Sequence, residues 1–191
     1  MRIIAGSLRH RTIEPPPDAS TTRPITDRVK ENLFNRLHSL GLLGEGNVAD
    51  IFAGTGTMGL EALSRGAEHC TFVERNRNIR AILERNIQTL GVADVSTVLG
   101  VDALVSDLPA LMPRRPLTLI FCDPPYAMTA DPRTMSAIAD LIQRLAAVAD
   151  AGAGLILRTQ TPVEPPTIEL WHPPRTHPYG SMAVHIYLRK G

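Results

Sequence analysis

A glycine-rich turn at residues 54–59 constrains the fold of this chain more than any other stretch. An apolar run at residues 48–52 leads into Gly54, Gly56 and Gly59, and a segment rich in Leu, Glu and Ala follows. This order is typical of the strand, tight turn and helix start of a nucleotide-binding α/β unit. Glycine is needed where a Cβ would hold the backbone away from a ligand, or where φ is positive. The pattern predicts a bound cofactor, although an ordinary strand-to-helix turn and a dinucleotide enzyme share it.

Strand-like and helix-like segments alternate after this turn. The expected strands cover residues 69–74, 95–99, 117–122 and 154–158. The expected helices cover residues 76–90, 104–111 and 134–149. Regular alternation of this kind predicts an α/β fold with a mostly parallel sheet and helices on both of its faces.

The two ends of the chain depart from this alternation. Residues 1–22 predict two short strands joined at Gly6 and Ser7, followed by an extended proline-rich linker. At the other end, residues 168–171 and 183–188 predict a closing strand pair with at least one antiparallel strand at the sheet edge. We therefore expect an N-terminal hairpin and linker at 1–22 and one main domain at 23–191.

A helix capped near Thr26 is predicted just before the first strand of the glycine unit. Its apolar side chains recur on one face, at Val29, Leu33, Phe34 and Leu37. The charged side chains that we expect outside that face are Arg28, Lys30, Glu31 and Arg36.

Composition limits the classes of protein to which this chain can belong. With 191 residues, 43% of them hydrophobic, it is long enough for one domain with a full core. Its formal charge of +1 is far from that of a protein that grips naked nucleic acid through phosphates alone. Cys70 and Cys122 lie in apolar runs, which predicts buried, reduced thiols and a cytoplasmic protein. No apolar run approaches the length of a membrane span.

Acidic residues follow or end three successive strands. Asp50 lies just before the glycine turn, Glu74 closes the next strand, and Asp102 follows the third. Ligands of open parallel sheets bind outside the carboxyl ends of the strands, where such acids meet. Glu74, some twenty residues beyond Gly54, is placed to accept hydrogen bonds from the two ribose hydroxyls of an adenosine-type ligand, and Asp102 to meet its exocyclic amine.

The stretch Asp123-Pro124-Pro125-Tyr126 follows the fourth strand and points to a reaction. The exocyclic amine of a flat base is a poor nucleophile because its lone pair is delocalised into the ring. If Asp123 and the carbonyl of Pro124 accept its two N–H bonds, the lone pair is freed to point at a methyl group. Tyr126 would stack on the base, which must be flipped out or unpaired.

These motifs resemble those of S-adenosylmethionine-dependent amino-methyltransferases. The stretches 23–34 and 60–67 look like the narrower family of 16S ribosomal RNA guanine-N2-methyltransferases, and the likeness runs over nearly the whole chain. The resemblance implies a Rossmann-like class I methyltransferase with a seven-stranded sheet and an antiparallel C-terminal strand. It also implies S-adenosylmethionine as cofactor, no metal, and a monomer acting on 16S ribosomal RNA in the small ribosomal subunit or its assembly intermediate.

The resemblance also implies roles for individual residues. The residues expected at the amine and the base are Asp123, Pro124, Pro125 and Tyr126. Those expected around the cofactor are Asp50, Phe52, Ala53, Gly54, Thr55, Gly56, Gly59, Glu74, Arg75, Asp102, Ala103 and Asp123. Those expected to contact RNA are Arg9, Arg11, Arg23, Thr26 and Arg28.

Three alternatives stay open from the sequence. The same chemistry suits another amine of RNA or DNA, because the Asp-Pro-Pro-Tyr motif fixes the reaction type better than the base. A nicotinamide-dependent oxidoreductase could use the same glycine pattern, although no tyrosine–lysine or histidine–aspartate pair lies near a strand end to move a proton. The third alternative is a non-catalytic RNA-binding assembly factor that has kept the fold.

Overall fold

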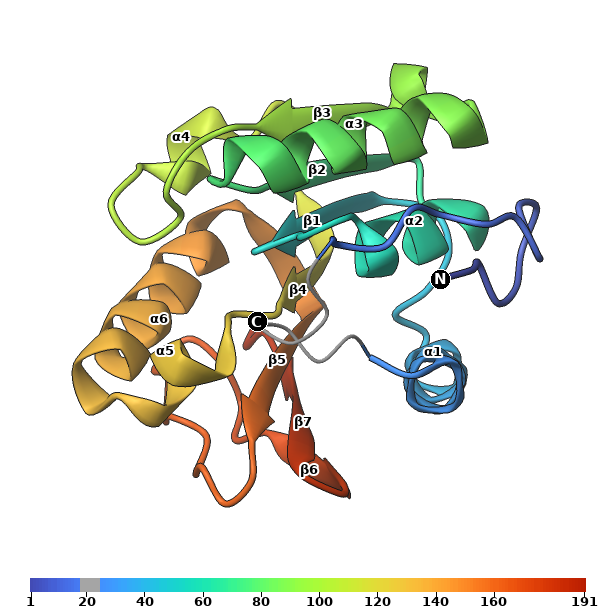
Figure 1. Ribbon diagram of the computed structural model, residues 1–191. Helices are drawn as coiled ribbons and strands as arrows, with labels where there is room; N and C mark the ends of the chain where they lie inside the picture. Colours follow the sequence, from blue (N-terminus) through green and yellow to red (C-terminus); the bar gives the residue numbers. More distant parts are fainter. Residues whose placement is uncertain (18–24) are drawn as a thin grey trace.

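The computed structural model describes residues 1–17 and 25–191 (Figure 1). The strands are β1 (Asn47–Ile51), β2 (His69–Val73), β3 (Ser96–Leu99), β4 (Leu117–Cys122), β5 (Ala149–Gln160), β6 (Arg175–Tyr179) and β7 (Met182–Leu188). The α-helices are α1 (Asp27–Ser39), α2 (Thr57–Ser64), α3 (Arg77–Leu90), α4 (Leu108–Leu111), α5 (Tyr126–Ala130) and α6 (Pro132–Leu145). The expected alternation of strand and helix is therefore confirmed.

The strands form one seven-stranded sheet in the order β3-β2-β1-β4-β5-β7-β6. All pairs from β3 to β5 are parallel, and β7 is antiparallel to both of its neighbours. This confirms a mostly parallel sheet with an antiparallel C-terminal strand. The chain runs outward from β1 to β3 on one side and returns through β4 on the other, so β1 and β4 flank the switch point where α/β sheets bind ligands.

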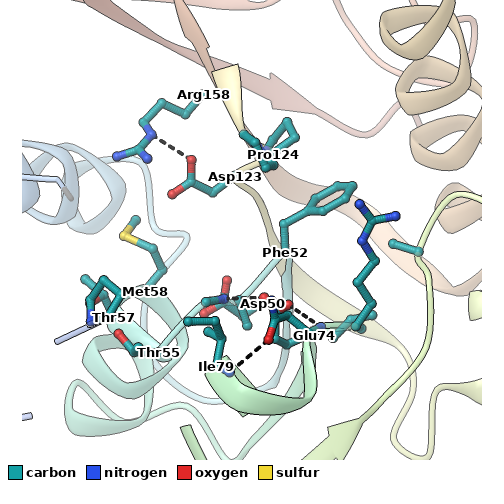
Figure 2. A pocket seen from close by; sticks show the side chains of 18 of the residues that line it. Asp50, Phe52, Thr55, Thr57, Met58, Glu74, Ile79, Asp123, Pro124 and Arg158 are labelled. Carbon is teal, nitrogen blue, oxygen red and sulfur yellow. Dashed lines mark hydrogen bonds and ion pairs between the residues drawn. The ribbon is translucent and has the colours of Figure 1, made fainter. Parts of the chain in front are cut away.

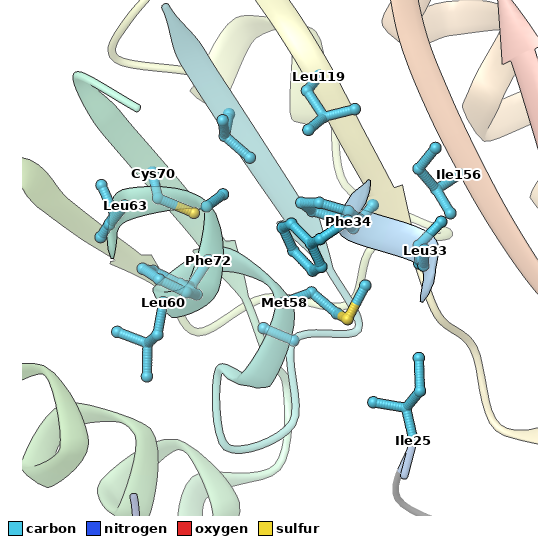
Figure 3. Packing of buried hydrophobic residues seen from close by; sticks show 14 of the residues in the cluster. Ile25, Leu33, Phe34, Met58, Leu60, Leu63, Cys70, Phe72, Leu119 and Ile156 are labelled. Carbon is cyan, nitrogen blue, oxygen red and sulfur yellow. The ribbon is translucent and has the colours of Figure 1, made fainter. Parts of the chain in front are cut away.

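Two apolar cores cover the two faces of the sheet because alternate strand residues point to opposite sides. Helices α1, α2 and α3 pack on one face, in a core that includes Phe34, Leu60, Leu119 and Ile156 (Figure 3). Helices α4 and α6 pack on the other face, against residues such as Ile120. Gly59 allows α2 to lie close to the sheet, since a Cβ there would come within 2.4 Å of Phe72.

Helix α1 begins where the sequence predicts, with one correction to its buried face. Thr26 accepts a hydrogen bond from the Val29 amide at 3.4 Å, as an N-cap does. Lys30, expected outside the apolar face, is instead only 1% exposed. Because Lys30 lies three and four residues before Leu33 and Phe34, it shares their face, and its ammonium pairs with the buried Glu61 at 3.3 Å.

The N-terminal segment forms a hairpin shape with less strand pairing than predicted. Its two arms run antiparallel and form one isolated bridge, Arg2 with Thr12, with backbone hydrogen bonds on both sides of it but no extended ladder. The turn packs on α2 so closely that a Cβ on Gly6 would lie 1.8 Å from the carbonyl oxygen of Ser64. Contacts with α2 thus replace the ladder that a longer hairpin would form. The predicted domain boundary at residue 22 lies outside the described residues and stays a prediction.

The C-terminal strand pair differs from the prediction in one partner. Residues 183–188 do lie in β7, but its hairpin partner is β6 and not residues 168–171. Trp171 is buried under α6, donates to the carbonyl oxygen of Ile142 at 3.2 Å, and forms only an isolated bridge with Arg189. β6 tolerates Pro178 because it is the edge strand, where a missing amide donor is least costly.

Several element bounds also differ from the expectation. β5 is longer than the predicted residues 154–158, α4 is shorter than residues 104–111, and α6 ends before a short 3-10 turn at Ala146–Val148. Cys70 and Cys122 are buried free thiols, as predicted. Among the described residues, no helix is both long and apolar enough to span a bilayer.

Candidate active site

A cavity of about 540 Å³ lies at the carboxyl ends of β1, β2 and β4 (Figure 2). The predicted site residues that line it are Asp50, Phe52, Ala53, Gly54, Thr55, Glu74, Arg75, Ala103, Asp123, Pro124, Pro125 and Tyr126. Three predicted residues, Gly56, Gly59 and Asp102, are not among its lining residues. The cavity therefore brings the glycine turn, Glu74 and the 123–126 stretch to one place.

The three glycines of the turn do different things. Gly54 has φ +56°, and a Cβ built on it meets nothing within 4 Å, so its backbone faces open space. Gly56 has φ +89° and would place a Cβ 2.5 Å from Leu83, which makes it a packing residue behind the turn. Gly59 donates its amide to the buried Asp50 at 2.8 Å. Asp50 thus fastens the start of α2 to β1.

Phe52 carries an unusual backbone conformation at the end of β1. Its φ is +61°, in the left-handed region that a bulky side chain rarely adopts. The next amide, that of Ala53, donates to the carbonyl oxygen of Val73 at 3.0 Å. Such conformations cluster at ligand sites, and this one lies in the wall of the cavity.

Glu74 is held at the cavity by two backbone amides. Its Oε2 accepts from Gly54 at 3.0 Å, and its Oε1 accepts from Asn76 at 2.8 Å. The carboxylate therefore has a fixed position beside the open face of Gly54. This is where the sequence places a ribose-binding acid, a role that stays a prediction.

Asp102 lies at the edge of the site and already has partners. Its Oδ2 pairs with Nη1 of Arg75 at 2.7 Å, and its Oδ1 accepts from the Leu104 amide at 3.0 Å. The Leu104 amide and Arg75 lower the pKa of Asp102. Its neighbour Ala103 lines the cavity, whereas the contact of Asp102 with an adenine amine stays a prediction.

Asp123 is paired with an arginine that the sequence analysis did not identify. Nε of Arg158 lies 2.6 Å from Oδ1 of Asp123 (Figure 2). Arg158 lies in β5, at the end of an apolar run, and lines the same cavity. Arg158 could have been identified from the pairing of β5 with β4, because Leu157 is level with Cys122 and Arg158 therefore comes level with Asp123.

Burial and like charge act on the acids around the cavity. Burial raises the pKa of Asp50 well above its ordinary value; the Gly59 amide opposes this, and the charges of Asp123 and Glu74 add to it. Burial also raises the pKa of Asp123, and the Arg158 guanidinium opposes that rise. The pKa of Asp123 therefore depends on the charge of Arg158.

The described residues among those predicted to contact RNA are not among the lining residues of the cavity. Arg9 is exposed on the N-terminal hairpin, and Arg28 is exposed on α1. Arg11 donates to the carbonyl oxygen of Thr89 at 2.5 Å, and Thr26 caps α1. Arg23 lies outside the described residues. The sequence analysis also missed that Met1, Pro16 and Pro17 line the cavity, because no motif marks them.

The cavity fits S-adenosylmethionine in size and in chemistry. Its volume falls in the range of cofactor pockets, the open face of Gly54 permits close approach to backbone, and Glu74 offers a fixed acceptor. Together, the sheet order and the site define a class I methyltransferase, an enzyme class that uses S-adenosylmethionine as methyl donor. The chain belongs to the family described as conserved hypothetical protein 95, whose model matches residues 1–188.

Individual relatives agree with this assignment. The Bacillus subtilis (strain 168) protein YlbH, named as a candidate rRNA methyltransferase, is 34% identical over 192 residues, with 100% of each chain covered. Ribosomal RNA small subunit methyltransferase D of Escherichia coli (strain K12) is 37% identical over 128 residues, which span 66% of this chain and 60% of that protein. The solved structure of yhhF from Escherichia coli superposes with a TM-score of 0.77 at 29% identity, covering 100% of this chain and 98% of that one.

Proposed function

We propose that this protein transfers a methyl group from S-adenosylmethionine to the exocyclic N2 amine of a guanine in 16S ribosomal RNA. The observation that carries the reaction type is the position of Asp123, Pro124 and Tyr126 in the wall of the cavity that holds Gly54 and Glu74. The ribosomal substrate is supported by the name of the Escherichia coli relative, a ribosomal RNA small subunit methyltransferase. Guanine N2 as the acceptor is supported by the resemblance of residues 23–34 and 60–67.

The protein's own part in the reaction is to prepare the amine. The Asp123 carboxylate and the Pro124 carbonyl accept its two N–H bonds and draw the nitrogen towards tetrahedral geometry. The lone pair then becomes available for bond formation, and the carboxylate stabilises the positive charge that develops on nitrogen. Tyr126 stacks on the base, a contact worth about 1–3 kcal/mol.

The cofactor would be held by groups that already have fixed positions. Glu74 would accept from the ribose hydroxyls, while the backbone at Gly54 and Ala103 would lie against the nucleoside. When bound, S-adenosylmethionine supplies an electrophilic methyl group on a sulfonium. Two acids that line the cavity, Glu74 and Asp123, make this region favourable for that positive charge.

The other readings of the sequence are less well supported. An oxidoreductase lacks support because the relatives reported above are named as methyltransferases. Calorimetry separates the two, since we expect S-adenosylhomocysteine to bind and NAD to give no heat of binding. Another RNA or DNA amine stays possible in chemical terms, and the mapping experiment below decides it. We further propose a cytoplasmic monomer that acts on the small subunit or its assembly intermediate.

The test of the substrate is to map the modified nucleotide. Small ribosomal subunits, their assembly intermediates and stripped 16S RNA, all from cells lacking this activity, are incubated with labelled donor and the purified protein. We expect label on the N2 position of a single guanine of 16S RNA. Label on another base, or no label on any of the three substrates, would contradict the proposal.

Glu74→Ala is predicted to weaken cofactor binding far more than turnover at saturation. The side chain accepts two backbone amides and would accept the ribose, and hydrogen bonds to a charged group contribute about 1.5–3 kcal/mol. Calorimetry should show a Kd for S-adenosylhomocysteine raised about 10- to 100-fold. The matched control is Glu84→Ala, an exposed acid on α3, which should leave the Kd unchanged. An unchanged Kd in Glu74→Ala would refute the ribose assignment.

Neutralising Arg9 and Arg28 together is predicted to weaken RNA binding and to flatten its dependence on salt. Each lost phosphate contact reduces the slope of log K against log salt by about 0.7–0.9. The control is the double variant of Arg114 and Arg133, two exposed arginines that remove the same charge elsewhere. Filter binding across a salt series checks the result, and equal slopes for the two double variants would place the RNA elsewhere.

A further inference from the structure

The pairing of β4 with β5 places Arg158 beside Asp123. In the parallel pairing of β4 and β5, Cys122 is level with Leu157, so the next residue on each strand, Asp123 and Arg158, comes off side by side. Their side chains are 24% and 13% exposed, and Nε lies 2.6 Å from Oδ1. The pair is thus built by the register of the sheet and largely removed from solvent.

The same guanidinium also contacts the aromatic ring of the Asp-Pro-Pro-Tyr stretch. Cζ of Arg158 lies 5.6 Å from the centroid of Tyr126, within the range of a cation–π contact. One side chain therefore touches both the carboxylate and the ring that the proposed reaction uses. An ion pair serving only to fill the interior would not need to contact both groups.

The charges that surround Asp123 make a nearby cation important. Asp50 faces it from β1 and Cys122 adjoins it in β4, and in both of these groups the charge of Asp123 raises the pKa. Arg158 faces it from β5 with the opposite charge. Burial alone would favour a protonated Asp123, which is a weaker acceptor for an N–H bond and lacks the negative charge that stabilises a developing cation, and Arg158 opposes that effect.

We propose that Arg158 is a positioning residue for methyl transfer: it holds Oδ1 of Asp123 and leaves Oδ2 to accept the N–H bond of the target amine. The inference rests on the proposed function, since it assumes that Asp123 receives an amine. Arg158 fixes the rotamer of Asp123 and favours its ionised form against the effect of burial. Its guanidinium also limits the side of Tyr126 on which a base can stack.

The test compares the pH dependence of kcat for the parent, Arg158→Gln, Arg158→Lys and Arg85→Gln at saturating donor and RNA. Asp123 must be ionised, so activity is lost as pH falls through its pKa, and removing Arg158 raises that pKa. We expect the acid midpoint to move up by about 1–3 pH units in Arg158→Gln, since an adjacent opposite charge lowers a carboxyl pKa by that amount. Arg158→Lys should shift the acid midpoint less than Arg158→Gln does, because lysine keeps the positive charge without the planar fork of the guanidinium.

The control and a second variant keep the test decisive. Arg85→Gln removes an arginine from the exposed pair with Glu14 and should leave the acid midpoint in place. If thermal unfolding shows that Arg158→Gln does not fold, Arg158→Met replaces it, because methionine keeps the apolar stem of the side chain. Its acid midpoint is then compared with that of the parent. A parental acid midpoint in the folded Arg158 variant would overturn the inference.

A measurement without substrate separates this inference from the proposed function. Carbon-13 carboxyl NMR follows the titration of Asp123, with its signal assigned by loss in Asp123→Asn. A higher Asp123 pKa in Arg158→Gln than in the parent supports the inference even if the mapping experiment finds a different acceptor. An unchanged Asp123 pKa overturns it even if the guanine of 16S RNA is labelled.

Discussion

Asp123→Ala should lower kcat for RNA methylation by on the order of 10²-fold or more and leave S-adenosylhomocysteine binding nearly unchanged. The carboxylate is prepositioned by Arg158 at 2.6 Å, so it stabilises the developing charge without reorganising. Losing one such preorganised group typically costs a factor of about 10²–10³. Single-turnover methylation, with enzyme and donor in excess over the RNA, together with calorimetry, separates the chemical step from binding.

Two comparisons make this result specific. Asp123→Asn keeps the shape of the side chain but removes the charge, so it should lose most of the same activity. Asp140→Ala removes an exposed acid from α6 and should behave as the parent does. Methylation by Asp123→Ala at the parental rate would show that the amine is activated by another group.

Glu61→Ala should reduce the free energy of unfolding by about 3–5 kcal/mol, as the loss of one partner of a buried ion pair does. Glu61 is fully buried and accepts from the amides of Ile4 at 2.8 Å and Ala5 at 3.1 Å. It also pairs with Lys30 at 3.3 Å and Arg65 at 2.8 Å. One carboxylate thus joins α1, α2 and the N-terminal hairpin. Its removal leaves the buried Lys30 ammonium and the amides of Ile4 and Ala5 without this partner.

A double-mutant cycle isolates the Lys30 part of this effect. Lys30→Met combined with Glu61→Gln should be less destabilised than the sum of the single variants, because neither charge is then left alone. Glu84→Ala, which removes an exposed acid paired with Arg80 at 3.7 Å, should change stability by less than about 0.5 kcal/mol. Urea unfolding measures all five variants, and a Glu61→Ala variant as stable as the Glu84 control would contradict the assigned role.

Local patterns in the sequence predicted most of the fold because they reflect local physics. The alternation around β1 to β4 follows from apolar runs and turn residues, and the cap at Thr26 follows from its hydroxyl. The errors arose where distant contacts decide. The buried face of α1 can hold Lys30 because Glu61 on α2 pairs with its ammonium, and residues 168–171 form no strand because Trp171 packs under α6. Neither partner is visible from the neighbouring sequence.

The candidate site shows the same division. Glycine spacing and the acids at strand ends placed Gly54, Glu74 and Asp123 around one cavity, since parallel strands end at the same edge. Arg158 was missed because its partner lies on another strand, and only the register between β4 and β5 brings them together. The left-handed φ of Phe52 was also invisible, since nothing in the residue type favours it.

A crystal structure with bound S-adenosylmethionine tests the central claim most directly. We predict that Glu74 hydrogen-bonds the ribose hydroxyls and that the sulfonium methyl faces the space between Asp123, Pro124 and Tyr126. A donor bound outside this cavity, or one whose methyl is separated from the Asp123 carboxylate by packed side chains, would contradict it.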